Sequence, residues 1–304
     1  MKSTYAKVIV TGGTGFIGAH LSSALAVAGY AVHAFDNFVA GRRAVDKRVK
    51  VHEADVRDKG ALKRVFKGAN YVFHLAALPR VQFSIEKPLE TSEVNIMGTM
   101  NMLIAARDAG VARVVYASSS SVYGDQKALP LHEGLPATPK SPYAMQKYFG
   151  EVMCRTFSEV YKLPTVSLRY FNVYGPGLDP DGAYALVIGK FLKQRGMGKP
   201  MTITSDGKQT RDFTHVSDVV RANLLAMKSP KLGKGEALNI GAGHNVSVNT
   251  IAHLIGGPTV KIPPRVEPRH TLADIRLAKR MLGWKPSVRF EDGLAELKAL
   301  FKIA

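Results

Sequence analysis

The sequence predicts an α/β protein built on a doubly wound parallel sheet. Through the N-terminal half of the 304-residue chain, short apolar runs alternate with helical segments, which is the pattern of repeated strand–helix–strand units. The first apolar run leads directly into a glycine-rich turn and a helix, and several later runs end in small or polar residues. Because ligands bind at the carboxyl ends of strands in such sheets, we expect the functional site there.

Composition restricts the class of protein. With 46% hydrophobic residues the chain can bury one large core or two modest ones. No apolar window reaches membrane-spanning length, so we expect a cytoplasmic protein without a signal peptide or membrane insertion. The single cysteine, Cys154, excludes an internal disulfide and any multi-cysteine metal site. No pair of histidines has ligand spacing on a plausible helix, so no metal is expected.

The formal net charge of +18 has several interpretations. It can attract nucleic acid, an anionic membrane surface or an acidic substrate, or it can be a solvated basic surface. Residues 40–67 contain ten Lys or Arg against four Asp or Glu, interspersed and without a nucleic-acid recognition motif. We therefore expect a solvated surface and no nucleic-acid partner.

The first strand and helix are expected at residues 7–11 and 19–28, joined by the glycine-rich turn TGGTGFIG (11–18). Glycines there let the backbone approach a pyrophosphate, which rests on the amides and positive dipole of the helix N-terminus. A glycine-rich turn alone is weak evidence, but the flanking strand and helix are the context required of a Rossmann-type fold. The expected dinucleotide contacts in this turn are Gly12, Gly15, Phe16, Ile17 and Gly18.

A second strand, residues 31–35, ends at Asp36, eighteen positions after Gly18. A carboxylate at this place accepts hydrogen bonds from the adenosine ribose hydroxyls, and its charge repels a 2′-phosphate. The sequence therefore favours NAD over NADP. Arg42 and Arg43 lie close enough in the sequence to keep NADP open.

Further strands and one long helix are expected at residues 49–53, 70–75, 112–117 and 88–109. Asp55 and Val56 follow the third strand and are placed to meet the adenine. The fourth strand ends in HLAA (74–77), whose small residues let a cofactor cross a strand end. The long helix carries Asn95. Packing at strand ends is the alternative interpretation of each of these residues.

Tyr143 and Lys147 are four residues apart and share one face of an expected helix. An ammonium beside a phenol favours the phenolate and lowers the pKa of the phenol toward that of a useful base. The alternative is an ordinary helix face. Four serines, 118–121, follow the fifth strand, which suggests hydroxyls aimed at the phenol rather than a solvated loop. A hydride acceptor, a phenol base and a hydroxyl partner together can oxidise a carbinol.

A series of sequence motifs extends over nearly the whole chain. The motifs are TGGTGFIG (11–18), DN (36–37), ADV (54–56), HLAA (74–77), VYASSSSVYGD (115–125), SPYAMQK (141–147), LRYFNVYGP (168–176), RDFTHVSDV (211–219), NIGAG (239–243) and LADIRLAKRMLGWKP (272–286). In them the sequence resembles the extended short-chain dehydrogenase/reductase family, particularly nucleotide-sugar epimerases of the UDP-glucose 4-epimerase type. The resemblance implies a Rossmann-type NAD-binding domain over residues 1–170, to which 212–243 partly returns. It also implies a smaller, discontinuous UDP-sugar domain over residues 171–304.

The resemblance further implies that Tyr143 takes the proton of the sugar 4-hydroxyl, aided by Ser119, while the hydride passes to the nicotinamide. The 4-keto sugar then turns over and receives the hydride on its other face. Lys147 is implied to hold the nicotinamide ribose. Ser119 stands four residues before Tyr123, the family's offset, and Ser120 or Ser121 can share its role. The other implied cofactor contacts are Asp36, Asn37, Asp55, Val56, Leu75, Ala76, Ala77, Asn95, Tyr143, Lys147 and Tyr170.

Neighbouring residues argue against related reactions. Ser121 stands where dehydratases and decarboxylases of the family carry an acidic residue, so no carboxylate is at hand for elimination. Cys154 is expected in the core rather than as the cysteine of the fucose-synthase type. A net oxidoreductase or dehydratase stays open as an alternative. So does a silent NAD-binding or nucleic-acid-binding scaffold, which the intact Ser119, Tyr143 and Lys147 disfavour.

On the substrate side, Asn172 and Arg211 match positions that bind the diphosphate, with structural caps or surface ion pairs as the alternative. Arg265 is a second diphosphate candidate, although its spacing to Thr271 is one residue shorter than usual. Residues 183–188 resemble the segment that cradles the uracil. The full implied set is Arg80, Ser119, Ser120, Asn172, Ala185, Val187, Arg211, Arg265 and Thr271.

Thr271 aligns with a specificity gate that is a bulky tyrosine in epimerases restricted to unsubstituted hexoses. A small residue there leaves room for an N-acetyl group, so we predict activity on UDP-GlcNAc/UDP-GalNAc as well as UDP-Glc/UDP-Gal. A uronate substrate stays open, with Arg80 and Arg269 as carboxylate partners. The helices at 88–109 and 143–161 are implied to form the four-helix interface of a homodimer, although their apolar faces equally suit packing on the sheet.

Overall fold

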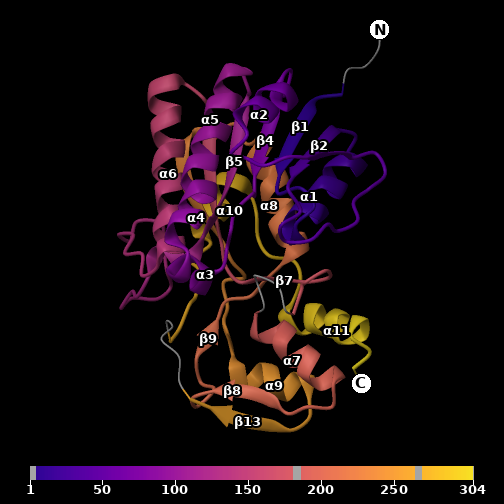
Figure 1. The fold of residues 1–304 in the computed structure, drawn as a ribbon. Coiled ribbons are helices and arrows are strands. Elements are labelled where there is room, and N and C mark those ends of the chain that lie inside the picture. Colours follow the sequence, from indigo (N-terminus) through magenta and orange to yellow (C-terminus); the bar gives the residue numbers. More distant parts are fainter. Residues whose placement is uncertain (1–4, 181–185, 264–268, 304) are drawn as a thin grey trace.

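The structure is a computed structural model that describes residues 5–180, 186–263 and 269–303. A large body, in which helices flank a sheet, lies above a smaller body of helices and short strands (Figure 1). Two residues of the predicted substrate site, Ala185 and Arg265, fall outside the described residues.

The large body is built on seven strands in the order β11-β6-β5-β4-β1-β2-β3, and every neighbouring pair is parallel. The strand order reverses between β1 and β4, which is the place where ligands bind in such sheets. The predicted doubly wound parallel sheet is therefore confirmed. Its strands are β1 (Lys7–Thr11), β2 (Ala31–Asp36), β3 (Lys50–Glu53), β4 (Tyr71–His74), β5 (Arg113–Ser119), β6 (Thr165–Tyr170) and β11 (Lys234–Ile240).

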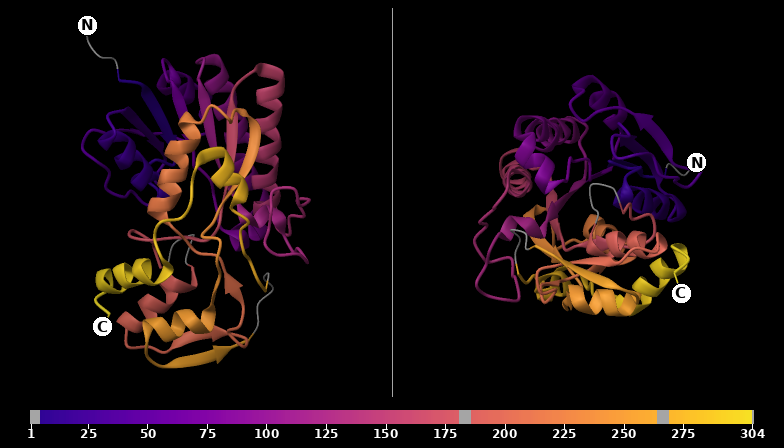
Figure 2. Two further views of the ribbon diagram at one scale, coloured as in Figure 1. Left: turned by 180° about the vertical axis from the view of Figure 1, so that it is seen from behind. Right: turned by 60° about the horizontal axis from the view of Figure 1, so that its bottom comes forward.

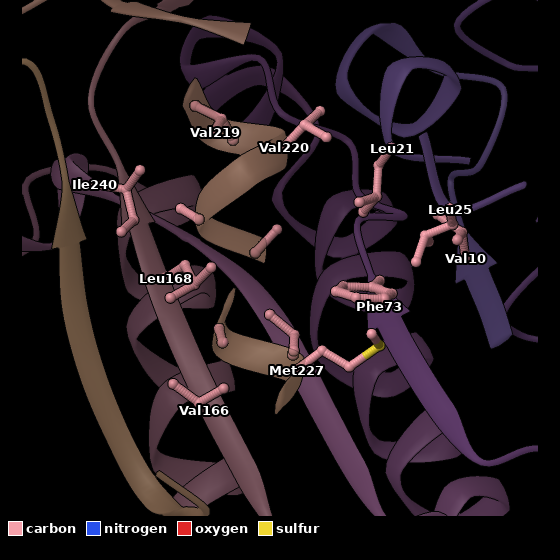
Figure 3. Close-up of a cluster of buried hydrophobic side chains, with 14 of the residues drawn as sticks. Val10, Leu21, Leu25, Phe73, Val166, Leu168, Val219, Val220, Met227 and Ile240 are labelled. Carbon is pink, nitrogen blue, oxygen red and sulfur yellow. The ribbon is translucent and has the colours of Figure 1, made fainter. Parts of the chain in front are cut away.

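Helices cover both faces of the sheet because neighbouring residues of each strand point to opposite sides. Val8 and Val10 of β1 belong to one core with α1 (Phe16–Val27), α8 (Val216–Lys228) and α10 (Arg276–Leu282). The left view of Figure 2, from behind, shows α8 and α10 in front of the sheet. Ile9 joins the opposite core with α2 (Lys59–Phe66), α5 (Thr99–Asp108) and α6 (Pro142–Tyr161). Figure 3 shows the first core, where strand residues Val166, Leu168 and Ile240 lie near Val219, Val220 and Met227 of α8.

Two helix boundaries differ from the prediction. The first helix begins at Phe16 rather than residue 19, because the glycine turn itself forms the first turn of α1 behind its N-cap, Gly15. The long helix expected at 88–109 is divided into α4 (Pro88–Ser92), a π-helical segment η1 (Glu93–Gly98) and α5. A π-helical turn inside a helix often marks a functional site. The short α3 (Val81–Glu86) precedes them.

The smaller body has its own core, formed by residues such as Phe191, Ile251 and Phe290. The chain enters this body after β6 and returns to the sheet for α8 and β11. After β11 the chain enters the smaller body a second time. It then returns to the sheet, where Ala278 of α10 packs in the first core. The elements below the sheet are β7 (Val173–Tyr174), α7 (Val187–Gly196), β8 (Met201–Thr204), β9 (Thr210–Arg211), β10 (Thr214–His215), β12 (Val246–Ser247), α9 (Val248–Ile255), β13 (Thr259–Ile262) and α11 (Phe290–Leu300).

Candidate active site

A cavity of about 590 Å³ lies at the carboxyl ends of the sheet strands. Its lining includes most of the residues predicted to bind the cofactor: Gly12, Gly15, Phe16, Ile17, Gly18, Asp36, Asn37, Val56, Leu75, Ala76, Ala77, Tyr143, Lys147 and Tyr170. The structure therefore brings together residues from five strand ends and from α6. Asp55 and Asn95 are not among the residues that line the cavity, and their contacts with a cofactor stay predictions.

The glycine turn is packed so closely that side chains have no room. A Cβ at Gly12 would lie 2.8 Å from the backbone nitrogen of Ala76, and its φ of +67° disfavours other residues. A Cβ at Gly18 would overlap the carbonyl oxygen of Gly12. Gly15 is the N-cap of α1 and provides no side-chain cap, so the amide end of this helix faces the cavity. This arrangement, which we name the glycine cradle, has the form that can hold the pyrophosphate of a dinucleotide.

Asp36 is held in one orientation at the end of β2. Its carboxylate accepts the N–H of Thr14 at 2.9 Å and that of Phe38 at 2.8 Å, and the residue is 9% exposed. This fixed carboxylate lies beside the cradle, where the adenosine ribose of a bound dinucleotide would need an acceptor.

Asp55 supports the neighbouring Asn37 rather than facing the cavity. It accepts a hydrogen bond from Asn37 Nδ2 at 2.8 Å. The hydrogen bonds from Arg57 lower the pKa of Asp55 to about 2. Arg42, one of the residues that had kept NADP open, stacks on the Phe38 ring with its guanidinium carbon 4.9 Å from the ring centroid. Arg43 lines the cavity but donates its Nε–H to the carbonyl of Gly177 at 3.0 Å.

Tyr143 and Lys147 lie together on the buried face of α6, with 5% and 4% of their surface exposed. Lys147 Nζ donates to the carbonyl of Ala117 at 2.8 Å and lies 6.0 Å from the centroid of the Tyr143 ring. Burial lowers the pKa of Lys147 to about 8, so below that pH the residue remains an ammonium beside the phenol. The Tyr143 backbone N–H donates to Ser84 Oγ at 3.0 Å, which ties the start of α6 to α3.

The serines at 118–121 have two different kinds of hydrogen-bond partner. Ser118 Oγ donates to the buried Glu151 carboxylate of α6, so this hydroxyl is engaged in the core. Ser119 Oγ accepts hydrogen bonds from the Ser121 N–H at 3.2 Å and from the Ser121 hydroxyl at 2.9 Å. Because both bonds use the Ser119 oxygen as acceptor, its own hydroxyl hydrogen is left for a substrate oxygen. Ser119 and Ser120 lie at the end of β5, next to the cavity-lining Ser118.

Two of the predicted diphosphate residues, Asn172 and Arg211, and the predicted specificity residue Thr271 have hydrogen bonds with the backbone of residues 210–212. Asn172 Nδ2 donates to the Asp212 carbonyl at 2.8 Å. Thr271 Oγ1 accepts the Asp212 N–H at 3.4 Å, and Arg211 Nη1 donates to the carbonyl of Thr210 at 2.9 Å. Arg80 lines the cavity as the residue before α3, and Val187 is the first residue of α7.

Several residues of the site were not predicted from the sequence. Ser84 holds the backbone of Tyr143, and Leu178 and Asp179 line the cavity from the loop after β7. The YGP segment was recognised, but nothing local in it indicates that the loop reaches the glycine turn. Ser84 and Gln146 likewise depend on long-range packing. Cys154 is fully buried, as predicted, and burial raises the pKa of its thiol to about 12.

Two kinds of feature are absent from the described part of the chain. No three histidine, cysteine or acidic side chains there come close enough to hold a metal ion. No helix among residues 5–180, 186–263 and 269–303 combines the length and apolarity needed to span a membrane.

The parallel sheet, the glycine cradle and the buried Tyr143–Lys147 face define an enzyme that uses a nicotinamide dinucleotide to oxidise a carbinol. Residues 8–241 match the NAD dependent epimerase/dehydratase family, and the chain belongs to this family. Its cofactor is NAD, and the residues of the cradle and Asp36 fit that group.

Several solved structures of nucleotide-sugar epimerases are similar to this chain over nearly its whole length. The UDP-glucose 4-epimerase of Thermotoga maritima, with UDP-glucose, is 36% identical with a TM-score of 0.93 over 97% of this chain and 98% of that chain. The UDP-N-acetylglucosamine 4-epimerase of Methanobrevibacter ruminantium, in complex with UDP-N-acetylmuramic acid, is 34% identical with a TM-score of 0.93 over 98% and 99%. The UDP-glucuronic acid 4-epimerase of Bacillus cereus, with UDP-glucuronic acid and NAD, is 32% identical with a TM-score of 0.89 over 97% and 99%. The chain is thus a nucleotide-sugar epimerase of the UDP-glucose 4-epimerase type, while these relatives differ in the sugar.

Proposed function

We propose that the chain interconverts UDP-Glc with UDP-Gal, and UDP-GlcNAc with UDP-GalNAc, through a transient 4-keto sugar. The observation that carries this proposal is the buried Tyr143–Lys147 face, which lines the same cavity as the glycine cradle. A phenol, an ammonium and a dinucleotide site around one cavity are what reversible oxidation of a carbinol requires.

In the mechanism, Tyr143 removes the proton of the sugar 4-hydroxyl through its phenolic oxygen. Lys147 stabilises the phenolate because its ammonium is buried, where charges interact more strongly than in water. Ser119 directs its remaining hydroxyl hydrogen to the 4-oxygen. NAD, held by the glycine cradle and Asp36, would supply the acceptor for the C4 hydride and its return to the other face of C4 after the 4-keto sugar has turned over. Tyr143 gives the proton back to the 4-oxygen, so the reaction consumes no net oxidant.

Ser121 supports epimerisation over elimination. The Ser121 hydroxyl donates to Ser119 Oγ at 2.9 Å, so Ser121 orients the serine proposed to assist Tyr143. A serine at this position also lacks the carboxylate that elimination would need to remove a further proton from the sugar. Release of a 4-keto sugar, or accumulation of NADH in proportion to substrate, would instead favour a dehydratase or a net oxidoreductase.

Thr271 supports the extension to N-acetylated sugars. It lies beside the Asn172–Asp212 contact, on the substrate side proposed for this smaller body. For a uronate, Arg80 is the better-placed partner because it lines the cavity, whereas Arg269 forms an ion pair with Asp206 at 2.8 Å. The diphosphate contacts of Asn172, Arg211 and Arg265 and the uracil contacts of Ala185 and Val187 stay proposals.

The test is to incubate the purified protein with UDP-Gal, UDP-GalNAc and UDP-GalA without added cofactor, and to separate the products. We expect conversion of the first two, and we expect Thr271→Tyr to lose at least about tenfold in kcat/KM for UDP-GalNAc while retaining UDP-Gal conversion. The matched control is Thr271→Ser, which keeps the space. Conversion of UDP-Gal alone by the unmodified protein would contradict the proposed range.

We also propose a homodimer formed through α4, α5 and α6, which lie side by side in Figure 1. Their outer faces carry exposed apolar side chains, among them Leu89 at 74% and Phe149 at 47%. Two such helix layers can bury these faces against each other as a four-helix bundle. The exposed apolar residues of α4, η1, α5 and α6 include Leu89, Met97, Ile104, Met145, Phe149, Val160 and Tyr161.

Light scattering is expected to give twice the 33.0 kDa chain mass for the unmodified protein. Phe149→Glu is expected to give a monomer, because a charge in an apolar interface is costly to bury. Val27→Glu is the control, since Val27 is 68% exposed on α1, away from this surface. A monomeric unmodified protein at working concentration would contradict the dimer.

A further inference from the structure

Gln146 lies between Tyr143 and Lys147 on α6, yet its side chain points away from the cavity. It is fully buried, and each polar atom of its amide has a partner. Its Oε1 accepts a hydrogen bond from Asn95 Nδ2 at 2.7 Å. Its Nε2 donates to Thr91 Oγ1 at 2.8 Å and to Ser92 Oγ at 3.1 Å. One turn of α6 thus presents the catalytic pair to the cavity and Gln146 to the adjoining helices α4 and η1.

Asn95 connects this contact to the cavity wall. Its Oδ1 accepts the N–H of Leu78 at 2.8 Å, and its Nδ2 donates to the carbonyl of Leu78 at 3.0 Å as well as to Gln146. The backbone of Leu78 fixes which end of the Asn95 amide is oxygen, and the second N–H of Asn95 then requires the oxygen of Gln146. Leu78 itself lines the cavity. Asn95 and Gln146 therefore form one interlocked contact, which we name the amide clasp.

The Asn95 end of the clasp is also connected to β1 and β4 by a series of hydrogen bonds whose donors and acceptors can be assigned. Thr99 Oγ1 gives its hydrogen to the carbonyl of Asn95 at 2.7 Å, so His74 Nε2 must be the donor in its 3.0 Å contact with Thr99. His74 Nδ1 then accepts from Thr11 Oγ1 at 2.7 Å, and that oxygen accepts the Ala76 N–H at 3.3 Å. Burial lowers the pKa of His74 to about 3, so its imidazole is neutral, as this chain requires.

The strand end 75–78 is consequently fixed at two points. Ala76 is held through Thr11 and His74, and Leu78 is held through Asn95. The π-helical segment η1 carries Asn95 between these contacts. Through its contact with Asn95, Gln146 ties α6 to the same anchor. The distance between the catalytic face of α6 and the strand end 75–78 is thus set by a side-chain contact rather than by apolar packing alone.

We propose that Gln146 is a positioning residue, which, through the amide clasp with Asn95, holds Tyr143 and Lys147 in register with the strand end 75–78. The proposal rests on the epimerase activity proposed above. Leu75, Ala76, Ala77 and Leu78 line the part of the cavity shared with Tyr143 and Lys147. A shift of α6 against this wall would move the phenol relative to both cofactor and sugar, and a misplacement of about 1 Å costs about 10²-fold in rate.

The test compares Gln146→Met with Met153→Ala in the purified holoenzyme. Methionine keeps the length of the side chain but cannot make the clasp, whereas Met153 is a buried residue of the same helix that belongs to the apolar core. We expect Gln146→Met to lower kcat for UDP-Gal by about 10- to 100-fold, with KM changed less than about threefold. We expect Met153→Ala to lower thermal stability to a similar or greater degree, with kcat within about threefold of the unmodified value.

Amide hydrogen exchange provides a readout that does not depend on activity. In Gln146→Met, the Leu78 amide and the first turn of α6 are expected to exchange faster, because the clasp protects both. The content of NAD per chain is expected to stay the same. Asn95→Leu combined with Gln146→Met is expected to lower kcat no further than the more damaging single variant, since both break one contact.

Unchanged exchange at Leu78 in Gln146→Met would overturn the clasp, whatever the activity of the unmodified protein. A kcat equal to that of Met153→Ala, or a rise in KM at constant kcat, would overturn the positioning role. Failure of the unmodified protein to convert any UDP-sugar would instead overturn the proposed function, and the exchange experiment would separate that result from failure of the clasp.

Discussion

Tyr143→Phe is expected to lower kcat for UDP-Gal epimerisation by about 10³-fold while leaving the bound NAD in place. The substitution removes only the phenolic oxygen, and the ring, 5% exposed, keeps its packing against α6 and the cavity wall. The loss is large because the substitution removes the group proposed to take the proton of the 4-hydroxyl. Ser119 keeps its hydrogen bonds to Ser121 but is a poor base. The measurements are kcat and the NAD content of the denatured protein.

Tyr148→Phe is the matched control, because Tyr148 lies on the same helix and does not line the cavity. Its kcat is expected to stay within about twofold of the unmodified value. A Tyr143→Phe variant retaining more than about a tenth of the activity would refute the base role, and loss of NAD together with activity would assign Tyr143 to cofactor binding instead.

Local features made the cofactor side of the site predictable. The glycine turn, Asp36 and the Tyr143–Lys147 spacing each depend on residues a few positions apart, so a strand, a turn and a helix are enough to give them a geometry. The structure places all of them around one cavity. Their roles in binding and catalysis remain predictions that the proposed variants test.

Contacts between distant segments could not be predicted in the same way. Asn95 was selected from the sequence as a cofactor contact, whereas its hydrogen bonds to Leu78 and to Gln146, which is 51 positions away, had no local signal. Helical periodicity also did not indicate the π-helical segment that places Asn95 there, because one π-helical turn adds only about one residue to the repeat, and this change is too small to be recognised in the apolar pattern. The helix start at Phe16 was also not predicted. The last residues of the glycine-rich sequence, 16–18, already form the first turn of α1, and glycines give no helical signal.

The free energy of unfolding is expected to fall by about 3–5 kcal/mol in Arg169→Met. Arg169 on β6 donates Nε–H to Glu151 Oε1 at 2.8 Å and Nη2–H to Oε2 at 2.7 Å, and both side chains are 6% exposed. Removal of the guanidinium leaves a buried carboxylate whose remaining donor is the Ser118 hydroxyl. Urea unfolding followed by the fluorescence of Trp284, the only tryptophan and fully buried, measures the change.

The double variant Arg169→Met with Glu151→Leu separates the cost of an unpaired charge from the loss of packing. Apolar replacements for both partners remove the desolvation penalty of the pair, so the double variant is expected to recover most of the stability lost in Arg169→Met. Glu151 lies one helical turn after Lys147, and Ser118 precedes Ser119, so this ion pair also supports the segments that carry the site. A double variant less stable than Arg169→Met would contradict this account and would mean that the pair stabilises the fold beyond what apolar packing provides.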